Sequence, residues 1–149
     1  MSETGPSSYD DTNIFAKILR GELPSHTVLE TETMKVIMDV MPQADGHALV
    51  IPKAPSRNLL DADPIIFADL MHTVRTMSQA AMRAFEADGV IVQQFNEAPA
   101  GQTVFHLHVH VIPRSEGVAL QRHSSGMADP DVLAAHAEKY RLALKELGA

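Results

Sequence analysis

The sequence contains no cysteine among its 149 residues. Disulfide bonds and thiolate nucleophiles are therefore excluded, and so are zinc sites built from cysteine ligands. Any nucleophile or metal ligand must come from another kind of side chain. Histidine is the side chain whose ordinary pKa lies nearest neutral pH, and the chain holds eight of them.

Basic residues are also in short supply. Twelve Lys and Arg stand against 19 Asp and Glu, which gives a net charge of −7 and an isoelectric point near 5.5. A general nucleic-acid binder normally presents a basic face, so we expect no nucleic-acid partner. An anionic ligand would have to be bound by local hydrogen-bond donors rather than by a long-range field.

Long apolar runs are absent as well. No stretch approaches the roughly 20 apolar residues that a membrane-spanning helix needs. The first residues, 1–11, contain no apolar segment that could act as a signal peptide. We therefore expect no membrane association, and a cytoplasmic location.

What the chain does contain is the composition of a globular protein, with 45% hydrophobic and 21% charged residues. Its length suits one domain. Residues 1–11 are polar, include Gly, Pro and Ser, and are expected to form a disordered leader. We expect residues 12–149 to form a single domain with a helical extension at its C-terminal end.

Three helices are predicted, at residues 14–19, 64–88 and 129–148. Asp11 or Thr12 is expected to cap the first helix, and Asp63 before Pro64 to cap the second. Asp129 before a proline marks the start of the third. An apolar stripe identifies the buried face of the long helix: Phe67, Leu70, Val74, Met77, Ala81 and Phe85.

Five strands are predicted, at residues 26–30, 34–40, 47–51, 90–95 and 104–112. Pro52 is expected to stop the third of them. The order is short helix, three strands, long helix, two strands and a last helix. This order indicates an α+β domain with a largely antiparallel sheet.

Histidine and aliphatic residues alternate without interruption from His106 to Val111. Successive side chains of an extended strand point to opposite faces, so His106, His108 and His110 share one face, about 6 to 7 Å apart. The other face is expected to meet the core and carries Phe105, Leu107, Val109 and Val111. So many imidazoles on one face need a reason, because each ring has two nitrogens to satisfy.

Three explanations compete. A histidine-rich polar face with no further role would explain one histidine better than three in strict alternation. A metal site would take two ligands from His-x-His and a third from His47, although no carboxylate lies near the motif in the sequence. A phosphate site would use neutral imidazole as a nucleophile and imidazolium as a hydrogen-bond donor to phosphate oxygens.

The residues before the motif favour the phosphate site. Gly101 lets the backbone come close to a ligand, and Gln102 and Thr103 add an amide and a hydroxyl donor. Asn96 ends the preceding strand and is expected to reach the same place. The sequence therefore predicts a phosphate-handling site around the three histidines.

The segment His106-Leu107-His108-Val109-His110-Val111-Ile112 matches the pattern His-φ-His-φ-His-φ-φ at every position, with φ apolar. It closely resembles the signature of the histidine triad (HIT) family of nucleotide hydrolases and transferases. The flanks at residues 100–104 and 113–114 are similar too. Residues 14–18, 21–24 and 46–53 resemble further family motifs, so the resemblance runs from about residue 13 to residue 114.

This resemblance implies a HIT-like fold, in which a five-stranded antiparallel sheet with a long helix becomes a ten-stranded sheet across a homodimer. It makes His108 the nucleophile that attacks the α-phosphorus of a nucleotide. His110 would hydrogen-bond the phosphoryl or leaving-group oxygen. His106 and His47 would hold the imidazoles in the required tautomers, while Gln102 and Thr103 would bind phosphate or the leaving group.

A purine nucleotide pocket is implied as well. Asp39 matches the acceptor of the ribose hydroxyls, and the base pocket would be formed by Ile14, Phe15, Ile18, Val40 and Leu49. Without the resemblance, we would instead place Phe15, Ile18 and Leu49 in the core and assign Asp39 as the cap of a turn.

One departure from the family is informative. Many bacterial members begin Cys-φ-Phe-Cys and hold a structural zinc with both thiols and two histidines. Asn13 and Ala16 stand at those two positions here. The resemblance therefore predicts that this zinc site is missing, and we expect neither a metal nor another cofactor.

The implied reaction has two steps, formation of a nucleotidyl-His108 intermediate and its hydrolysis by water. The leading substrates are a nucleoside phosphoramidate or a nucleotidyl-lysine adduct, as in the Hint branch, and Asp39 favours them. A dinucleoside polyphosphate, as in the Fhit branch, suits residues 100–104. A mainly nucleotide-binding or protein-binding role is the third alternative, against which the intact triad with Thr103 argues.

Overall fold

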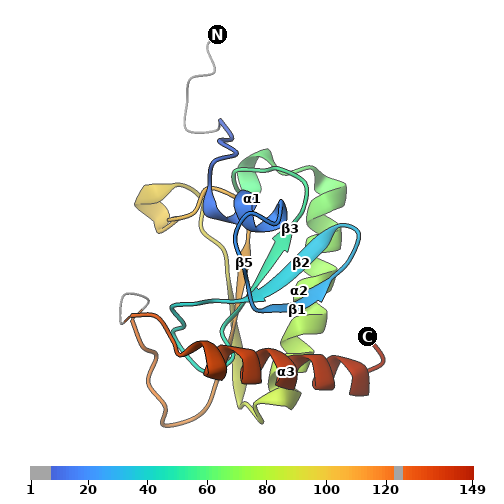
Figure 1. The fold of residues 1–149 in the computed structure, drawn as a ribbon, viewed down its shortest axis with the longest axis vertical. Coiled ribbons are helices and arrows are strands. Elements are labelled where there is room, and N and C mark those ends of the chain that lie inside the picture. The colour runs from blue at the N-terminus through green and yellow to red at the C-terminus, as the bar shows by residue number, and fades with distance from the viewer. Residues whose placement is uncertain (1–7, 123–125) are drawn as a thin grey trace.

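The computed structural model describes residues 8–122 and 126–149 and contains one antiparallel sheet in the order β1-β2-β3-β5-β4 (Figure 1). The strands are β1 (Thr27–Glu30), β2 (Met34–Met38), β3 (Ala48–Pro52), β4 (Gly89–Gln93) and β5 (Val109–Arg114). The helices are α1 (Ile14–Leu19), α2 (Pro64–Ala84) and α3 (Pro130–Glu146), with short 3₁₀ turns at Leu59–Asp61 and Ala98–Ala100. The predicted α+β class, element order and five-stranded antiparallel sheet are confirmed. Residues 1–7 of the expected leader lie outside the described residues.

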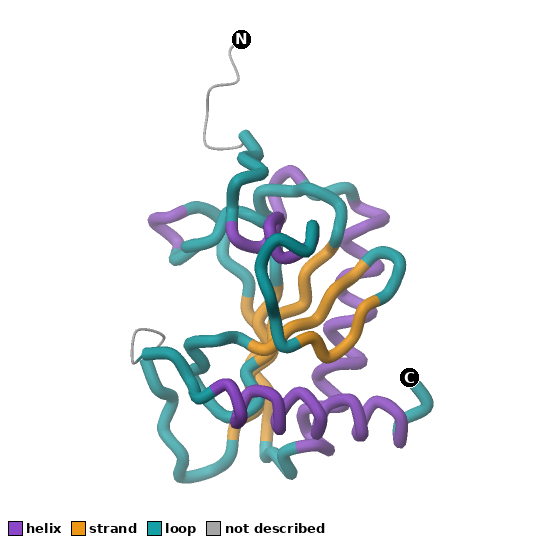
Figure 2. Tube along the Cα trace, viewed as in Figure 1, coloured by secondary structure: helices purple, strands orange, loops and turns teal. Residues whose placement is uncertain are grey.

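The two faces of the sheet are covered by different helices. One face packs against α2 and α3 in the main apolar cluster, which takes alternate residues of the central strands, such as Val36 and Val50. The opposite face carries a smaller cluster with α1: Phe15, Ile18, Ile37, Leu49 and Ile51. His110 of β5 pairs with Leu49 of β3, and paired residues point to the same face. His110 therefore lies on the face that carries the α1 cluster, opposite the main apolar cluster. In Figure 2 the strands lie between α1, in front of them, and α2, behind them.

Strand β5 begins at Val109, whereas the sequence predicted a strand from Val104. Residues 104–106 form a bend, and the pairing of β5 with β3 begins only at Val109. His106 and His108 therefore precede the strand, and only His110 belongs to it. The prediction of three histidines within one strand is wrong in this respect.

The late start of β5 has a cause in β3. Continuing the register of the two strands would set Leu107 opposite Pro52, which has no N–H to donate. The carbonyl oxygen of Pro52 is instead bonded to Nε2 of His106 at 2.7 Å. The N–H of Leu107 donates to the carbonyl oxygen of Ser56 at 2.8 Å, so this stretch is extended without being part of the sheet.

The predicted alternation survives in spite of the bend. Leu107, Val109 and Val111 all reach the main apolar cluster, as expected for the face opposite the histidines. Phe105 does not follow them. It is only partly buried, and the guanidinium carbon of Arg57 lies 4.2 Å from the centroid of its ring. The expectation that Phe105 belongs to the core is therefore wrong.

The caps of the long helices agree with the sequence. The side chains of Asp63 and Asp129 each accept a backbone N–H at 2.8 Å in the first turn that follows. Helix α1 is capped by Asn13, whose side-chain oxygen accepts a backbone N–H at 2.9 Å. The prediction of Asp11 or Thr12 as this cap is wrong by one or two residues.

Helix α2 ends at Ala84, short of the predicted residue 88. Glu86 adopts a left-handed conformation with φ of 48°, and the N–H of Ala87 donates to the Met82 carbonyl at 3.1 Å. This is a helix-ending turn that glycine usually provides. The predicted apolar stripe of α2 does lie in the main cluster. No helix in the described ranges has both the length and the apolar composition needed to cross a membrane.

Helix α3 fixes the loop between β2 and β3. The buried hydroxyl of Tyr140 donates to the carbonyl oxygen of Gly46 at 2.5 Å. Gly46 has a φ of 84°, and a Cβ there would come within 2.6 Å of the Phe85 ring. The residues on either side of this loop are Asp39 and His47, so the C-terminal helix holds the part of the chain that presents them.

Candidate functional site

A cavity of about 490 Å³ opens on the sheet face that α1 covers. Its wall is mostly apolar, and its volume lies within the range of about 300 to 1,000 Å³ that is usual for small-molecule sites. It brings together most of the residues predicted from the sequence: Ile14, Phe15, Ile18, Asp39, Val40, Leu49, Thr103, His108 and His110. These residues come from α1, from the two positions after β2, from β3, from the segment leading into β5 and from β5 itself.

Two of the triad rings line the cavity between two phenylalanines. The rings of His108 and His110 meet edge to face, with centroids 5.0 Å apart. Phe15 of α1 packs against His108 at 4.8 Å, and Phe95 packs against His110 at 5.7 Å. Both histidines are buried to more than nine tenths. Their orientations are thus set by packing as well as by hydrogen bonds.

The tautomer of His108 follows from its hydrogen bond. Its Nδ1 lies 2.6 Å from the carbonyl oxygen of His106. A carbonyl oxygen can only accept, so Nδ1 carries the proton. In the neutral ring the lone pair is then on Nε2. His108 therefore has the tautomer that a nucleophilic imidazole requires.

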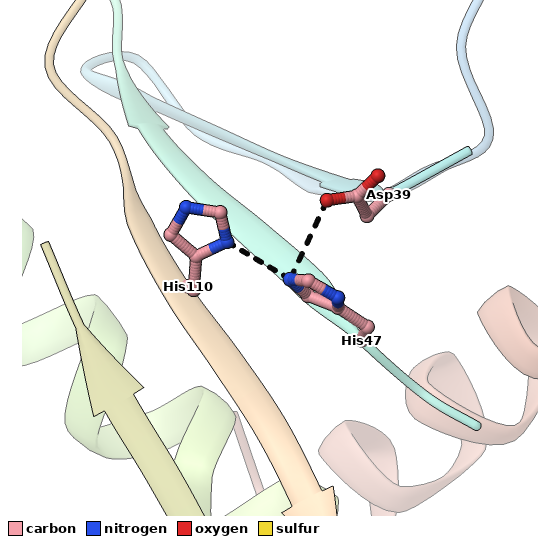
Figure 3. A group of neighbouring side chains, drawn as sticks. All are labelled: Asp39, His47 and His110. Carbon is pink, nitrogen blue, oxygen red and sulfur yellow. Dashed lines mark hydrogen bonds and ion pairs between the residues drawn. The ribbon is translucent and has the colours of Figure 1, made fainter. Parts of the chain in front are cut away.

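The tautomer of His110 is set through His47, whose ring contacts both His110 and Asp39 in Figure 3. The backbone N–H of Gln43 donates to Nδ1 of His47 at 3.0 Å, so His47 is neutral and carries its proton on Nε2. That Nε2 lies 2.9 Å from Nδ1 of His110 and donates to it. The proton of a neutral His110 is consequently on Nε2. One ring of the cavity thus has a lone pair at Nε2 and its neighbour has an N–H there.

Asp39 lines the cavity and also caps a turn. Its place in the cavity wall is the one that the ribose assignment needs, although the residue is itself buried. Its Oδ1 also accepts the N–H of Met41 at 2.8 Å, which is the cap of a turn. Its Oδ2 lies 3.4 Å from Nε2 of His47. A carboxylate has about four lone-pair sites, so it can accept from several donors at once.

His106 and His47 do not line the cavity, in contrast to the other two triad members. His106 is 1% exposed, and burial holds the pKa of its ring below the ordinary value. Its two nitrogens are bonded to the Pro52 carbonyl oxygen and to the hydroxyl of Tyr9, each at 2.7 Å. The family resemblance implied that His106 and His47 together hold the imidazoles in the required tautomers. In the structure they act on different rings, since His47 holds His110 and the His106 carbonyl holds His108.

The loop before the triad contributes less directly than predicted. Thr103 lines the cavity, but Gln102 and Asn96 do not. Gln102 is 4% exposed, and its amide is bonded to the backbone of Arg57, Val104 and Glu97 and to the side chain of Asn58. Asn96 bonds to the Leu59 N–H and the Gln94 amide. Both residues shape the loop that presents Thr103.

Two places for a metal can be tested against the side chains present. Asp39, His47 and His110 offer ligand atoms within 4.8 Å of one another. Both nitrogens of His47 are nevertheless engaged in the hydrogen-bond chain, so a metal would have to replace those bonds. The family's structural zinc site does not fit, because Ala16 has no donor atom and the Asn13 side chain is used in capping α1. The residues favour a hydrogen-bonded centre over a metal centre.

Several cavity residues were missed by the sequence analysis. Met127, beyond β5, is 75% exposed and reaches the cavity because the N–H of Ala128 bonds to the Val40 carbonyl at 2.9 Å. Pro24, Ser25 and His26 line the cavity from the connection between α1 and β1. None of these segments carries a local pattern. Their place depends on chain segments that lie far apart in the sequence.

Known proteins are similar to this chain in sequence and in fold. The model of the HIT domain matches residues 20–117. A crystal structure from Bartonella henselae, of a Hit-like protein described as involved in cell-cycle regulation and bound to an unknown ligand, is 48% identical. It superposes with a TM-score of 0.86 and covers 91% of this chain and 99% of that chain.

Two curated relatives have named activities. The adenylylsulfatase HINT3 of Arabidopsis thaliana is 35% identical over 124 residues, which are 79% of this chain and 63% of that protein. This chain therefore spans less than two thirds of the plant protein. The adenosine 5′-monophosphoramidase HNT1 of Saccharomyces cerevisiae is 34% identical over 113 residues, which cover 76% of this chain and 69% of that protein.

Proposed function

Because this chain belongs to the HIT domain family, we propose that it is a nucleotide hydrolase that cleaves the bond between an α-phosphate and its leaving group. The substrates are purine nucleoside phosphoramidates or related nucleotidyl conjugates. One observation carries this proposal. The hydrogen bonds of His108 and His110 place a lone pair on one ring and an N–H on the next, with centroids 5.0 Å apart. A nucleophile beside a fixed donor is the arrangement that attack on a phosphoryl group needs.

In the first step, Nε2 of His108 attacks the α-phosphorus. The bond from phosphorus to the leaving group breaks, and its electron pair departs with that group, which takes up a proton from solvent and leaves as the amine. The Nε2–H of His110 donates to a phosphoryl oxygen or to the departing nitrogen. The His106 carbonyl oxygen keeps the Nδ1 proton of His108 in place and stabilises the positive ring that results.

In the second step, water attacks the nucleotidyl-imidazole and releases a nucleoside monophosphate. His108 regains its lone pair at Nε2, so the site is ready for another turnover. Phosphoryl transfer depends mainly on positioning and charge stabilisation. In other enzymes Mg²⁺ stabilises the charge of the phosphoryl group. Here the imidazole N–H of His110 and the hydroxyl of Thr103 would stabilise that charge as hydrogen-bond donors.

The cavity supports a nucleotide as the occupant. Its apolar wall from α1 suits a base, and Asp39 supplies an acceptor for the ribose hydroxyls. The relatives named adenylylsulfatase and adenosine 5′-monophosphoramidase support an adenylyl group in particular. A purine ring would pack against Phe15 and Ile18, while the phosphate would lie at His108 and His110.

The sheet supports a homodimer. Strand β4 is the last strand in the order β1-β2-β3-β5-β4, so its outer edge is available for pairing. Val92 of β4 is 44% exposed. Pairing of two β4 edges would produce the ten-stranded sheet implied by the family resemblance.

A turnover assay tests the function. A fluorogenic adenosine phosphoramidate should have a higher kcat/KM than diadenosine polyphosphates, and the His108→Ala variant controls for contaminating hydrolases. Preference for the polyphosphates would replace the substrate class proposed here. Nucleotide binding without turnover of either substrate would show a binding protein instead of an enzyme.

A further inference from the structure

The segment before α1 brings a side chain to the site that the proposed mechanism does not use. The hydroxyl of Tyr9 lies 2.7 Å from Nδ1 of His106, and their rings meet edge to face with centroids 5.6 Å apart. We propose that Tyr9 is a positioning residue, whose hydroxyl holds the His106 ring in one tautomer and one orientation, and thereby the carbonyl that holds His108. This inference rests on the proposed function and deepens it.

The direction of each hydrogen bond follows from its partners. The Pro52 carbonyl can only accept, so Nε2 of His106 carries the proton. In the neutral ring Nδ1 is then an acceptor, and the Tyr9 hydroxyl must donate to it. The hydroxyl oxygen in turn accepts from Nδ2 of Asn13 at 3.1 Å. The donors thus run in one direction, from Asn13 through Tyr9 and His106 to Pro52.

The orientation of the Asn13 amide is fixed independently. Its Oδ1 accepts the N–H of Ala16 as the cap of α1, at 2.9 Å. Nδ2 must therefore be the atom on the other side, where it donates to Tyr9 and to the Asp10 carbonyl oxygen. A single side chain both starts the helix that covers the cavity and holds the tyrosine that contacts the triad.

Charge states agree with these roles. Burial raises the pKa of Tyr9 above its ordinary value, so the phenol keeps its proton. Burial also lowers the pKa of His106, so the imidazole stays neutral and keeps an acceptor nitrogen. The raised pKa of Tyr9 and the lowered pKa of His106 both favour a phenol that donates a hydrogen bond to a neutral imidazole.

The bend before β5 explains why side-chain anchors matter here. The β3–β5 ladder ends at Val109, so strand pairing does not extend to His106. The peptide unit whose carbonyl meets His108 is held by the Leu107 N–H on Ser56 and by the two bonded nitrogens of the His106 ring. Tyr9 supplies one of these anchors.

The segment that carries Tyr9 is itself attached to the protein. The carbonyl oxygen of Ser8 accepts from Nη1 of Arg57 at 3.1 Å. Arg57 is fixed by two hydrogen bonds to the carboxylate of Glu97, at 2.8 and 2.9 Å. The N-terminal segment, the loop after β3 and the loop before the triad therefore meet at one guanidinium group.

Removal of one hydroxyl tests the proposal. Tyr9→Phe keeps the ring and removes only the donor, so kcat should fall about 3- to 10-fold with KM unchanged within about twofold. Asn13→Asp keeps a good helix cap, but its carboxylate would compete for the Tyr9 proton, so it should act in the same direction. The matched control is Thr12→Val, which removes a hydroxyl that bonds Asp10 and not His106.

A nitrogen readout separates positioning from general loss of structure. In ¹⁵N-histidine-labelled protein, the Nδ1 resonance of His106 should shift in Tyr9→Phe and Asn13→Asp and stay unchanged in Thr12→Val. An unchanged His106 resonance in Tyr9→Phe, or an unchanged kcat, would overturn the inference. If the wild-type protein turns over no substrate, the proposed function fails, and the nitrogen resonances alone decide this inference.

Discussion

Nε2 of His47 lies 2.9 Å from Nδ1 of His110, and a backbone group decides which of them donates. The Gln43 N–H donates to Nδ1 of His47, so the proton of His47 is on Nε2 and is donated to Nδ1 of His110. The proton of a neutral His110 is therefore on its own Nε2. The N–H that His110 would donate to a substrate is therefore set by a fully buried residue that does not line the cavity.

Replacing His47 should affect chemistry more than binding. His47→Leu removes the donor to His110 and leaves a buried acceptor unsatisfied, which costs about 1 to 3 kcal/mol. We expect kcat to fall about 10- to 100-fold, with a smaller change in KM. His47→Gln keeps an N–H near the Nε2 position and should retain more activity. Equal kcat values in His47→Leu and the wild type would remove this hydrogen bond from the mechanism.

Turnover should not require a metal. The hydrogen bonds that the proposed reaction needs at His108 and His110 are supplied by groups of the protein. Both nitrogens of His47 are already hydrogen-bonded. Activity should survive exhaustive EDTA treatment, and elemental analysis should find no stoichiometric zinc. Loss of activity on chelation, with recovery on addition of zinc, would instead identify Asp39, His47 and His110 as a metal centre.

Ribonucleotides should be preferred over 2′-deoxynucleotides. Asp39 lines the cavity, and its carboxylate is the acceptor proposed for the ribose hydroxyls. Loss of one charge-assisted hydrogen bond costs about 1.5 to 3 kcal/mol, so kcat/KM should drop about 10- to 150-fold for the deoxy sugar. Matched kinetics with the two sugars measure this directly. The same kcat/KM for both would exclude Asp39 as the ribose acceptor.

Acid should destabilise the fold in part through His106. Burial lowers the pKa of His106 in the folded state and outweighs the opposing effects of the Pro52 carbonyl and Asp61. As the pH falls through the unfolded-state pKa, about 6.5, only the unfolded chain takes up this proton, so the free energy of unfolding falls. The loss continues until the lower folded-state pKa is reached. His106 contributes at most about 1.4 kcal/mol per pH unit.

Urea unfolding between pH 8 and pH 5 measures this contribution. His106→Gln should show a shallower loss of stability with falling pH than the wild type. His136 also has its pKa lowered by burial and remains in both proteins, so the comparison isolates His106. Parallel pH profiles of the two proteins would contradict the assignment.

The parts of the fold that sequence predicts well are those with a local cause. Asp63 and Asp129 stand before prolines, and both cap the helices expected there. From Leu107 to Val111 the alternation also separates the residues of the main apolar cluster from the two histidines that line the cavity, because the pleat of an extended chain is a local property. Asp39 was placed near the triad by resemblance, and the structure does bring it into the same cavity as His108.

The parts that sequence misses depend on distant partners. The start of β5 is set by Pro52, which ends β3 and offers no N–H to the incoming chain. Gln102 looks like a ligand donor, but its amide is used up by a network that includes Arg57 and Asn58. Tyr9 lies in a polar stretch with no periodicity, and only its contact with His106 gives it a role.

The central claim is that His108 is the nucleophile, and a rapid-quench experiment tests it most directly. Substrate labelled at the α-phosphate is mixed with enzyme, quenched within one turnover and analysed by peptide mapping. The label should lie on His108 as an acid-labile, base-stable phosphoramidate. His108→Ala should lose both label and turnover while still binding nucleotide, because a nucleophile adds little ground-state affinity. A label on another residue, or substantial turnover by His108→Ala, would contradict the mechanism.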